Sequence, residues 1–523
     1  MPTDSTDALP WLFTWICCGA VIAFGGSLWF TLISFLEESV ADDFGLSRGW
    51  RGAVPAAFYA GMAIGAALLG ALSDGRILSC VSGRRSVALL SMTLAGLAAL
   101  ASAAMPSIAM LVISVAVLGG GVGGCLPAAE ALFAETTTGI SPHARSRWIA
   151  LLSGWFGVGS IPTALIAGAI LARGRSSVGG LAPWRLMLII FGVLELLITA
   201  LLACVLPVSE KWSALRRRGD VNAQGNATSL GAAATKHRAG EGCLVLLHPL
   251  EEGASGSATA TSTYTGSVTA AANVRKDLIA HICERSLFVT TVLLWAVWFG
   301  FNFAVSGFTA FLPELLDERG GRPSSVSPAG NSTASNGTAP LLPPRDGTPS
   351  TWRRQAGKVA IYNLFAVPGV VFAATIVQLR GGRRVVLGGC ILLTAICTAL
   401  FALRGTSSTV LLVLGCASAF FSNGAWASLS LLTVEAYPTH LRATGFGYAH
   451  ASHSIAGVIG PYFGGLFIGW GGGVESGTTI ALAAFAGACA VAGVAACVIR
   501  SRRPQDEDAA SMASGESLLG VSE

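Results

Sequence analysis

The stretch Glu435–Gly447, which reads EAYPTHLRATGFG, lies between two long apolar runs, Val410–Leu432 and Phe446–Trp470. Its proline, Pro438, stops any helix that would continue from the first run into the second. The glutamate that opens the stretch and its arginine, Arg442, are seven positions apart, or about two turns if one helix were continuous. With the helix broken, we expect each to contact the ends of other helices. The stretch therefore predicts a polar junction at the edge of an apolar layer.

Apolar runs of this length recur along the chain of 523 residues. Hydrophobic residues make up 53% of the sequence and charged residues 12%, whereas soluble domains carry roughly 25% charged residues. So few charges cannot cover a soluble protein, and about 20 apolar residues suffice to span a bilayer. Because the runs are continuous rather than alternating, they predict helices. The runs are Trp11–Phe35, Gly52–Leu72, Val87–Ala104, Ile108–Phe133, Trp148–Ala172, Trp184–Leu206, Leu287–Leu312, Val359–Leu379, Val385–Leu403, Val410–Leu432, Phe446–Trp470 and Thr478–Ile499.

The runs fall into two sets of six, the arrangement of transporters built from internal repeats. We therefore expect an all-α polytopic membrane protein, with about twelve transmembrane helices in two pseudo-symmetric six-helix bundles at 1–208 and 287–500. Lys and Arg cluster in 209–286, which is also rich in Ala, Gly, Ser and Thr. This composition predicts a largely disordered cytoplasmic linker, with the tail 501–523 on the same side.

The loop 314–357 falls on the opposite, exoplasmic side of the membrane in this topology. It is rich in Ser, Pro and Gly and contains two N-x-[ST] sequons, at Asn331 and Asn336. Such sequons in an exoplasmic loop predict a glycoprotein. The net charge of +5 is spread in short clusters between apolar runs, so it indicates membrane topology rather than nucleic-acid binding.

Two sequence elements occur in both halves. One is Gly70–Asp74 followed by Gly83-Arg84-Arg85, and its partner is Arg380–Arg384. The other is the Glu435–Gly447 stretch, whose degenerate copy in the first half consists of Glu135, Pro142, Arg145 and Arg147.

These motifs resemble signatures of the major facilitator superfamily. Gly70–Arg85 looks like its loop signature G-x-L-x-D-x-x-G-R-R, with an insertion before Gly83. Glu435–Gly447 resembles the signature E-x-Y-P-T-x-x-R-x-x-G-x-G, typical of the branch that holds synaptic-vesicle-glycoprotein-related proteins and organic-ion transporters. The resemblance implies the major facilitator fold and alternating access. It also implies that charged residues latch the inner gate, namely Asp74, Arg84, Arg85, Glu135, Arg145, Glu435 and Arg442.

The sequence departs from the family pattern at several positions. An acidic pair common in the first span aligns with Gly26 and Trp29, and Leu379 stands where the second loop copy would have an acidic residue. A family arginine in the eleventh span aligns with Ser454. The sugar-porter sequence P-E-S-P-R has only a distant counterpart at 207–211, so a sugar substrate is not favoured.

Polar and aromatic residues inside the spans are candidates for substrate contact, because such groups are costly in a membrane. The alternative is hydrogen bonding between helices. His450 and His453, three apart on one helix face, and the buried acid Glu130 are candidates for coupling to a proton. We expect Glu195, in the sixth span, to pair structurally. The substrate-contact candidates are Trp29, Trp155, Trp295, Trp298, Asn302, Asn363, Asn423 and Trp426.

The sequence as a whole predicts a secondary active or facilitative transporter of a small organic solute, organic ion-like more than sugar-like, that works by alternating access. The expected partners are the lipid bilayer, the solute, and a proton or another coupling ion, with the protein acting as a monomer and no nucleic acid, cofactor or metal involved. The alternative is a non-transporting membrane receptor or scaffold that retains the transporter fold. An enzyme is not expected, because no nucleophile–base set or metal cluster occurs. The glycine run at 119–124 contains G-x-G-x-x-G but lies inside a span, which favours helix packing over dinucleotide binding.

Overall fold

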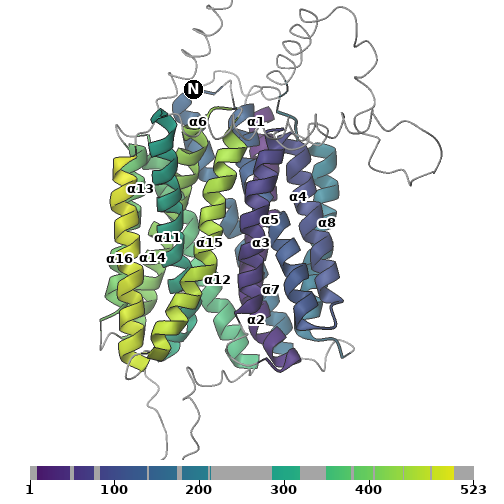
Figure 1. Cartoon of the computed structure of the whole chain (residues 1–523), viewed down its shortest axis with the longest axis vertical. Helices are drawn as coiled ribbons and strands as arrows, with labels where there is room; N and C mark the ends of the chain where they lie inside the picture. Colours follow the sequence, from purple (N-terminus) through teal and green to yellow (C-terminus); the bar gives the residue numbers. More distant parts are fainter. Residues whose placement is uncertain are drawn as a thin grey trace, which may run out of the picture.

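The computed structural model describes residues 9–46, 52–75, 83–137, 140–173, 180–209, 213, 285–318, 349–378, 382–403, 407–439, 441–470 and 474–499. The glycosylation candidates Asn331 and Asn336 and nearly all of the predicted linker lie outside these ranges. Within them every regular element is a helix, and the long helices run side by side (Figure 1).

The N-terminal half forms six spans. Four are single helices, namely α3 (Ala53–Ser73), α4 (Arg84–Ala103), α5 (Ile108–Thr136) and α8 (Pro183–Val205). The first span consists of α1 (Leu9–Ile22), the π-helical turn η1 (Ala23–Ser27) and α2 (Leu28–Phe44), and the fifth consists of α6 (Pro142–Leu152) and α7 (Trp155–Arg173). The fifth apolar run is therefore interrupted rather than continuous. The backbone N–H groups of residues 153 and 154 donate to carbonyls three residues back, at 3.3 and 3.0 Å, which tightens the chain between the two helices.

The C-terminal half consists of six single helices. They are α11 (Arg285–Glu318), α12 (Pro349–Ile376), α13 (Gly382–Phe401), α14 (Ser408–Ala436), α15 (Arg442–Trp470) and α16 (Val474–Val498). Pro438 lies in the break between α14 and α15, where the sequence predicts it.

The described part of the chain has 11 spans that are long and apolar enough to cross a membrane. The remaining long helix, α15, is less apolar because His450, Ser452, His453 and Ser454 lie along it. It runs between α11 and α3 and contacts both (Figure 1). Many Leu, Ile and Val side chains are exposed on the outside of the helices, as contact with lipid requires. The chain is a multi-pass integral membrane protein.

Glycines allow α3 and α5 to pack closely. A Cβ added at Gly61 would lie 1.8 Å from the carbonyl oxygen of Ala116, and one at Gly119 would lie 2.0 Å from that of Phe58. Both distances are far too short for any side chain. The glycine run of the fourth span is therefore a helix-packing surface, as predicted.

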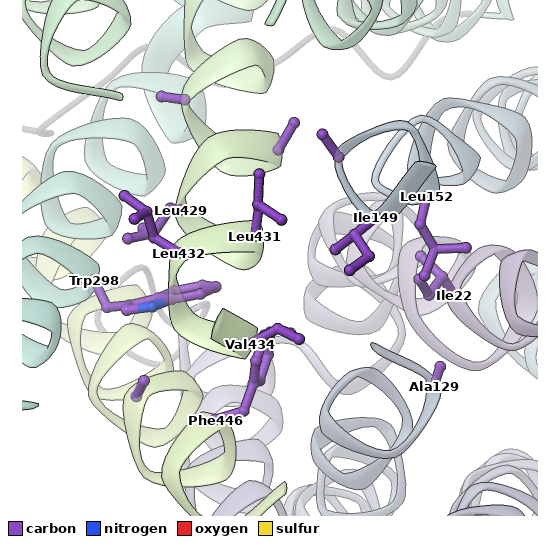
Figure 2. Close-up of a cluster of buried hydrophobic side chains, with 14 of the residues drawn as sticks. Ile22, Ala129, Ile149, Leu152, Trp298, Leu429, Leu431, Leu432, Val434 and Phe446 are labelled. Atoms are coloured by element: carbon purple, nitrogen blue, oxygen red, sulfur yellow. The ribbon is translucent and has the colours of Figure 1, made fainter. Parts of the chain in front are cut away.

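The two halves meet along α3 with α15 and along α7 with α12. One hydrophobic core cluster draws residues from both halves. Figure 2 shows part of it, with Leu431 and Val434 of α14 on the side turned toward Ile149, Ile22 and Ala129. We call the end of the molecule where α3, α5 and α14 end and α4, α13 and α15 begin the latch end, which is uppermost in Figure 1.

Candidate functional site

The latch end contains a buried cluster of charges centred on Arg84, which we call the first latch. The Arg84 guanidinium forms an ion pair with Asp74 and donates to Glu135 Oε1 from Nε at 3.0 Å and from Nη2 at 2.8 Å. The side chains of all three residues are 0% exposed. Nη2 also donates to the carbonyl oxygen of Thr439 at 2.7 Å. Because Thr439 precedes α15, this bond joins the two halves.

The first latch is close to neutral in total charge. Arg442 lies at the start of α15 with its Nη1 3.9 Å from Glu135 Oε1, so two guanidinium groups face two carboxylates. A buried charge without a counter-charge is strongly destabilising, and pairing removes most of that cost. Gly83, just before Arg84, has φ +124°, a conformation that only glycine adopts readily. This explains why a glycine precedes the arginine pair in the motif.

Asp74 acts as a cap for a helix of the other half. Its Oδ2 accepts hydrogen bonds from the backbone N–H and the hydroxyl of Thr444, both at 2.6 Å. Thr444 lies in the first turn of α15, where backbone N–H groups lack partners within the helix and the helix dipole favours a negative charge. The carboxylate at the end of α3 therefore binds the N-terminus of α15 across the interface between the halves.

A second latch mirrors the first in the C-terminal half. Arg383, at the start of α13, pairs with Glu435, at the end of α14, with Nε 2.6 Å from Oε2 and Nη2 3.0 Å from Oε1. Ser146 of α6 accepts from Arg383 Nη2 at 2.7 Å and donates to Glu435 Oε1 at 2.8 Å. Ser146 belongs to the N-terminal half, so its hydroxyl links the halves. The pair occupies the positions that Arg84 and Glu135 occupy in the first half.

The glycines and the tyrosine of the Glu435–Gly447 stretch have packing roles. A Cβ at Gly447 would lie 2.2 Å from the carbonyl oxygen of Ala66, and one at Gly445 would lie 2.5 Å from the ring of Tyr437. Gly447 therefore lets α15 approach α3, and Gly445 leaves room for the ring of Tyr437. Burial raises the pKa of Tyr437 to about 12, opposed by a hydrogen bond with Thr291.

The structure does not bring all predicted gate residues to the interface. Glu435 and Arg442 have different partners, as expected, and Arg442 Nε donates to the carbonyl oxygen of Val434 at 3.0 Å. Arg85 Nη2 donates to the carbonyl of Ala203 at 2.6 Å within its own bundle. Arg145 is half-buried on α6, and no ion pair joins it to another residue in the described ranges.

Sequence reasoning missed three residues of the two latches. Arg383 was visible in the repeated G-R-R element but was not placed in the gate. Ser146 and Thr444 gave no signal, because a hydroxyl residue at a helix end is too common to stand out.

Four aromatic side chains gather around His453 of α15, away from the latch end. Its ring centroid lies 4.9 Å from that of His450, 5.0 Å from Trp426, 5.6 Å from Trp298 and 6.2 Å from Phe30. Phe30 belongs to the N-terminal half, so this aromatic cluster also spans the interface. Both ring nitrogens of His453 are buried and lack hydrogen-bond partners among the described residues.

The other substrate-contact candidates have several different environments. Asn302 donates to the carbonyl oxygen of His453 at 2.7 Å, beside the aromatic cluster. Asn363 and Asn423 donate to carbonyls four residues back in their own helices, at 2.9 and 2.8 Å. Trp298 donates to the Thr433 hydroxyl at 2.9 Å.

The remaining tryptophan candidates lie in packed surroundings. Trp29 is fully buried and donates to Glu195 within the N-terminal bundle, so Glu195 has the structural partner expected for it. Trp155 covers Gly19 of α1, where a Cβ would lie 2.3 Å from its ring. Trp295 packs against Tyr448 with ring centroids 6.1 Å apart.

The family model described as Major Facilitator Superfamily matches residues 16–344 and 349–520. The chain belongs to the Major Facilitator Superfamily, as its motifs and helix arrangement indicate. Members of this family are transporters.

The chain is 27% identical over 434 residues to the niacin transporter NiaP of Acinetobacter baylyi, covering 82% of this chain and 81% of that one. It is 38% identical over 97 residues to human synaptic vesicle glycoprotein 2C, covering 18% of this chain and 13% of that one. Among solved structures it resembles the human organic anion transporter MFSD10, with a TM-score of 0.58, 18% identity and coverage of 93% of this chain and 99% of that one. It also resembles the proton:xylose symporter XylE, with a TM-score of 0.61, 16% identity and coverage of 94% and 95%. These structural similarities establish the fold.

Proposed function

We propose that this protein is a secondary transporter that moves a small organic solute across the membrane by alternating access. The observation that carries the proposal is the chemistry of the latch end. There the halves are joined by a few hydrogen bonds and ion pairs, including Asp74 with Thr444, Arg84 with Thr439, and Ser146 with Glu435. Such contacts can break and reform when rigid bundles rock about a central site.

The latches bias the protein toward a state that is closed at the latch end. We infer that this end faces the cytoplasm, because arginines concentrate there. Opening must separate Asp74 from the N-terminus of α15 and Ser146 from the second latch. A solute can drive that change only through different affinities for the two states.

The aromatic cluster around His453 favours a flat organic solute over a sugar. Trp298, Trp426 and Phe30 offer ring faces, and His453 offers ring nitrogens that have no hydrogen-bond partner among the described residues. Rings of this kind stack on heteroaromatic groups. The similarity to niacin transporters along most of the chain supports a heteroaromatic organic ion as the substrate class.

Uptake by purified protein in proteoliposomes tests the proposal. The solute panel contains nicotinate, a larger aromatic carboxylate, an aromatic cation and xylose. We expect saturable uptake of an aromatic ion and none of xylose. The smaller ring face in Trp298→Phe should weaken uptake by up to about tenfold, whereas the matched control Trp184→Phe, in α8 and bonded to Asp43, should change it little.

Two results would contradict this function. Saturable binding of an aromatic ion without any flux would favour the receptor or scaffold that retains the fold. Preferential uptake of xylose would overturn the substrate class.

A further inference from the structure

Glu130 and Ser430 occupy equivalent positions in the two halves and touch each other. Glu130 lies on α5 and Ser430 on α14, two helices of 29 residues each. Each residue lies five positions before the glutamate that is next to last in its helix, Glu135 or Glu435. The Glu130 carboxyl and the Ser430 side chain are joined by a hydrogen bond. Residues related by a two-fold axis meet only close to that axis, so this contact lies at the centre of the interface between the bundles.

The surroundings of Glu130 are apolar and closed to bulk solvent. The residue is 2% exposed, and its Oε2 is buried without a hydrogen-bond partner in the described part of the chain. Its neighbour Ala129 lies in the core cluster that both halves share, across from Leu431 and Val434 (Figure 2). A carboxylate with an unpartnered oxygen in such a place is costly, whereas the neutral acid is not.

No opposite charge offsets that cost. Among the described residues Glu130 forms no ion pair, and the Cys18 thiol of α1 interacts with it electrostatically. The first latch lies five residues further along α5, about 7.5 Å along the axis, and its charges are balanced among themselves. The titratable groups on the latch-end halves of the helices packed against α5 are Cys17, Cys18, Asp74, Arg84, Arg85, His143, Arg145, Arg147, Glu435, Arg442, Tyr448, His450 and His453.

We propose that Glu130 is the proton-binding site coupled to opening and closing of the latch end. Since it names the coupling ion and its site, this inference rests on the proposed alternating access. In the closed state Glu130 is a carboxylic acid bonded to Ser430. When the bundles part, the Ser430 bond breaks and water reaches the carboxyl. The O–H bond then breaks, its electron pair stays on the carboxylate, and the proton passes to water at the latch end.

The sign of the pH effect follows from linkage. The closed state binds one more proton than the open state, so raising the pH favours opening. The ratio of closed to open protein should fall by up to about tenfold per pH unit while the two states differ by one proton. The neutral variant Glu130→Gln resembles the protonated acid, so it should stay closed and lose this dependence.

Glu195 provides a matched control. It is a fully buried acid of the same bundle, and its Oε1 has no hydrogen-bond partner within the described ranges. Its partner Trp29 moves with it, because both belong to the N-terminal bundle. Opening leaves its surroundings unchanged, so Glu195→Gln should keep the wild-type pH dependence.

The test measures a distance across the latch end in lipid nanodiscs without any solute. Spin labels are introduced as non-canonical amino acids at positions 143 and 384, which are exposed on α6 and α13, so the native cysteines remain in place. Double electron–electron resonance then gives the closed and open populations between about pH 5 and pH 9. We expect a pH-dependent ratio in the wild type and in Glu195→Gln, a flat profile in Glu130→Gln, and a retained but displaced profile in Glu130→Asp.

A wild-type slope in Glu130→Gln, or a flat profile in the wild type, would overturn the proposal. Because no solute is used, these outcomes are independent of the uptake assay. Absence of flux in proteoliposomes would overturn the proposed function and leave a Glu130-dependent profile standing.

Discussion

The hydroxyl of Ser146 gives the sharpest test of the second latch. Ser146→Ala removes one oxygen and leaves the ion pair between Arg383 and Glu435 in place. Two hydrogen bonds are lost, at 2.8 and 2.7 Å. Both exist only while the bundles are closed at the latch end, so the variant should favour the open state without weakening either bundle.

The size of the effect follows from the partners. A hydrogen bond to a charged group contributes about 1.5–3 kcal/mol. The side chains of Arg383 and Glu435 are 21% and 15% exposed, and water can replace part of what is lost. We therefore expect a net cost of about 2 kcal/mol to the closed state, or roughly thirty-fold in its population relative to the open state. A closed-to-open ratio of about 99:1 would become about 3:1.

The label pair at 143 and 384 measures this ratio directly. Ser114→Ala is the matched control, because Ser114 accepts a 2.8 Å hydrogen bond from Ser102 inside the N-terminal bundle. That variant should leave the ratio unchanged. An unchanged ratio in Ser146→Ala, or an equal shift in Ser114→Ala, would contradict the role of Ser146 in the second latch.

Three further predictions concern stability. Arg84→Ala leaves two buried carboxylates with a distant counter-charge, so it should lower the free energy of unfolding by about 3–5 kcal/mol; thermal unfolding in detergent measures this, and a melting temperature equal to the wild type would contradict the buried ion-pair cluster. Gly61→Ala places a Cβ against a carbonyl of α5 and should abolish the monodisperse protein peak in gel filtration. Gly389→Ala, where an added Cβ would have nothing within 4 Å, should keep that peak. Equal peaks in the two variants would show that α3 and α5 pack differently. Burial raises the pKa of Tyr437 from the ordinary tyrosine value of about 10 to about 12, so the unfolded chain loses this proton first and the free energy of unfolding should fall as the pH rises between those values. Tyr437→Phe should reduce that fall, and an identical fall would place the effect elsewhere.

Much of the fold follows from apolar patterning and proline. The continuous runs mark the helices, and Pro438 marks the break between α14 and α15. The separate partners of Glu435 and Arg442 also follow, because that break removes the helical register that would bring them together. The interruption of the fifth span at Ser153–Gly154 and the π-helical turn before Trp29 were not visible, since both depend on how neighbouring helices pack.

The candidate site was only partly predictable. Charged motifs point to Arg84 and Glu135 because buried charges are rare and need partners. Ser146, Thr444 and Ser430 could not be found, because each acts through a partner in the other half of the chain. Asn363 and Asn423 are candidates for substrate contact in the sequence, but the structure shows that each amide donates to a carbonyl of its own helix. The sequence cannot distinguish these two roles of an amide inside a span.

Locking the latch end tests alternating access most directly. Gln378, in the turn that follows α12, donates to the carbonyl oxygen of His143 on α6 at 3.4 Å, and both residues lie at the surface of the latch end. Cysteines replace both residues, accessible native cysteines are changed to serine, and a short reducible thiol crosslinker joins the pair in proteoliposomes. If the protein works by alternating access, crosslinking stops uptake of the solute that the panel identifies, binding of that solute from the opposite side persists, and reduction restores uptake. Uptake that continues at the uncrosslinked rate would contradict alternating access.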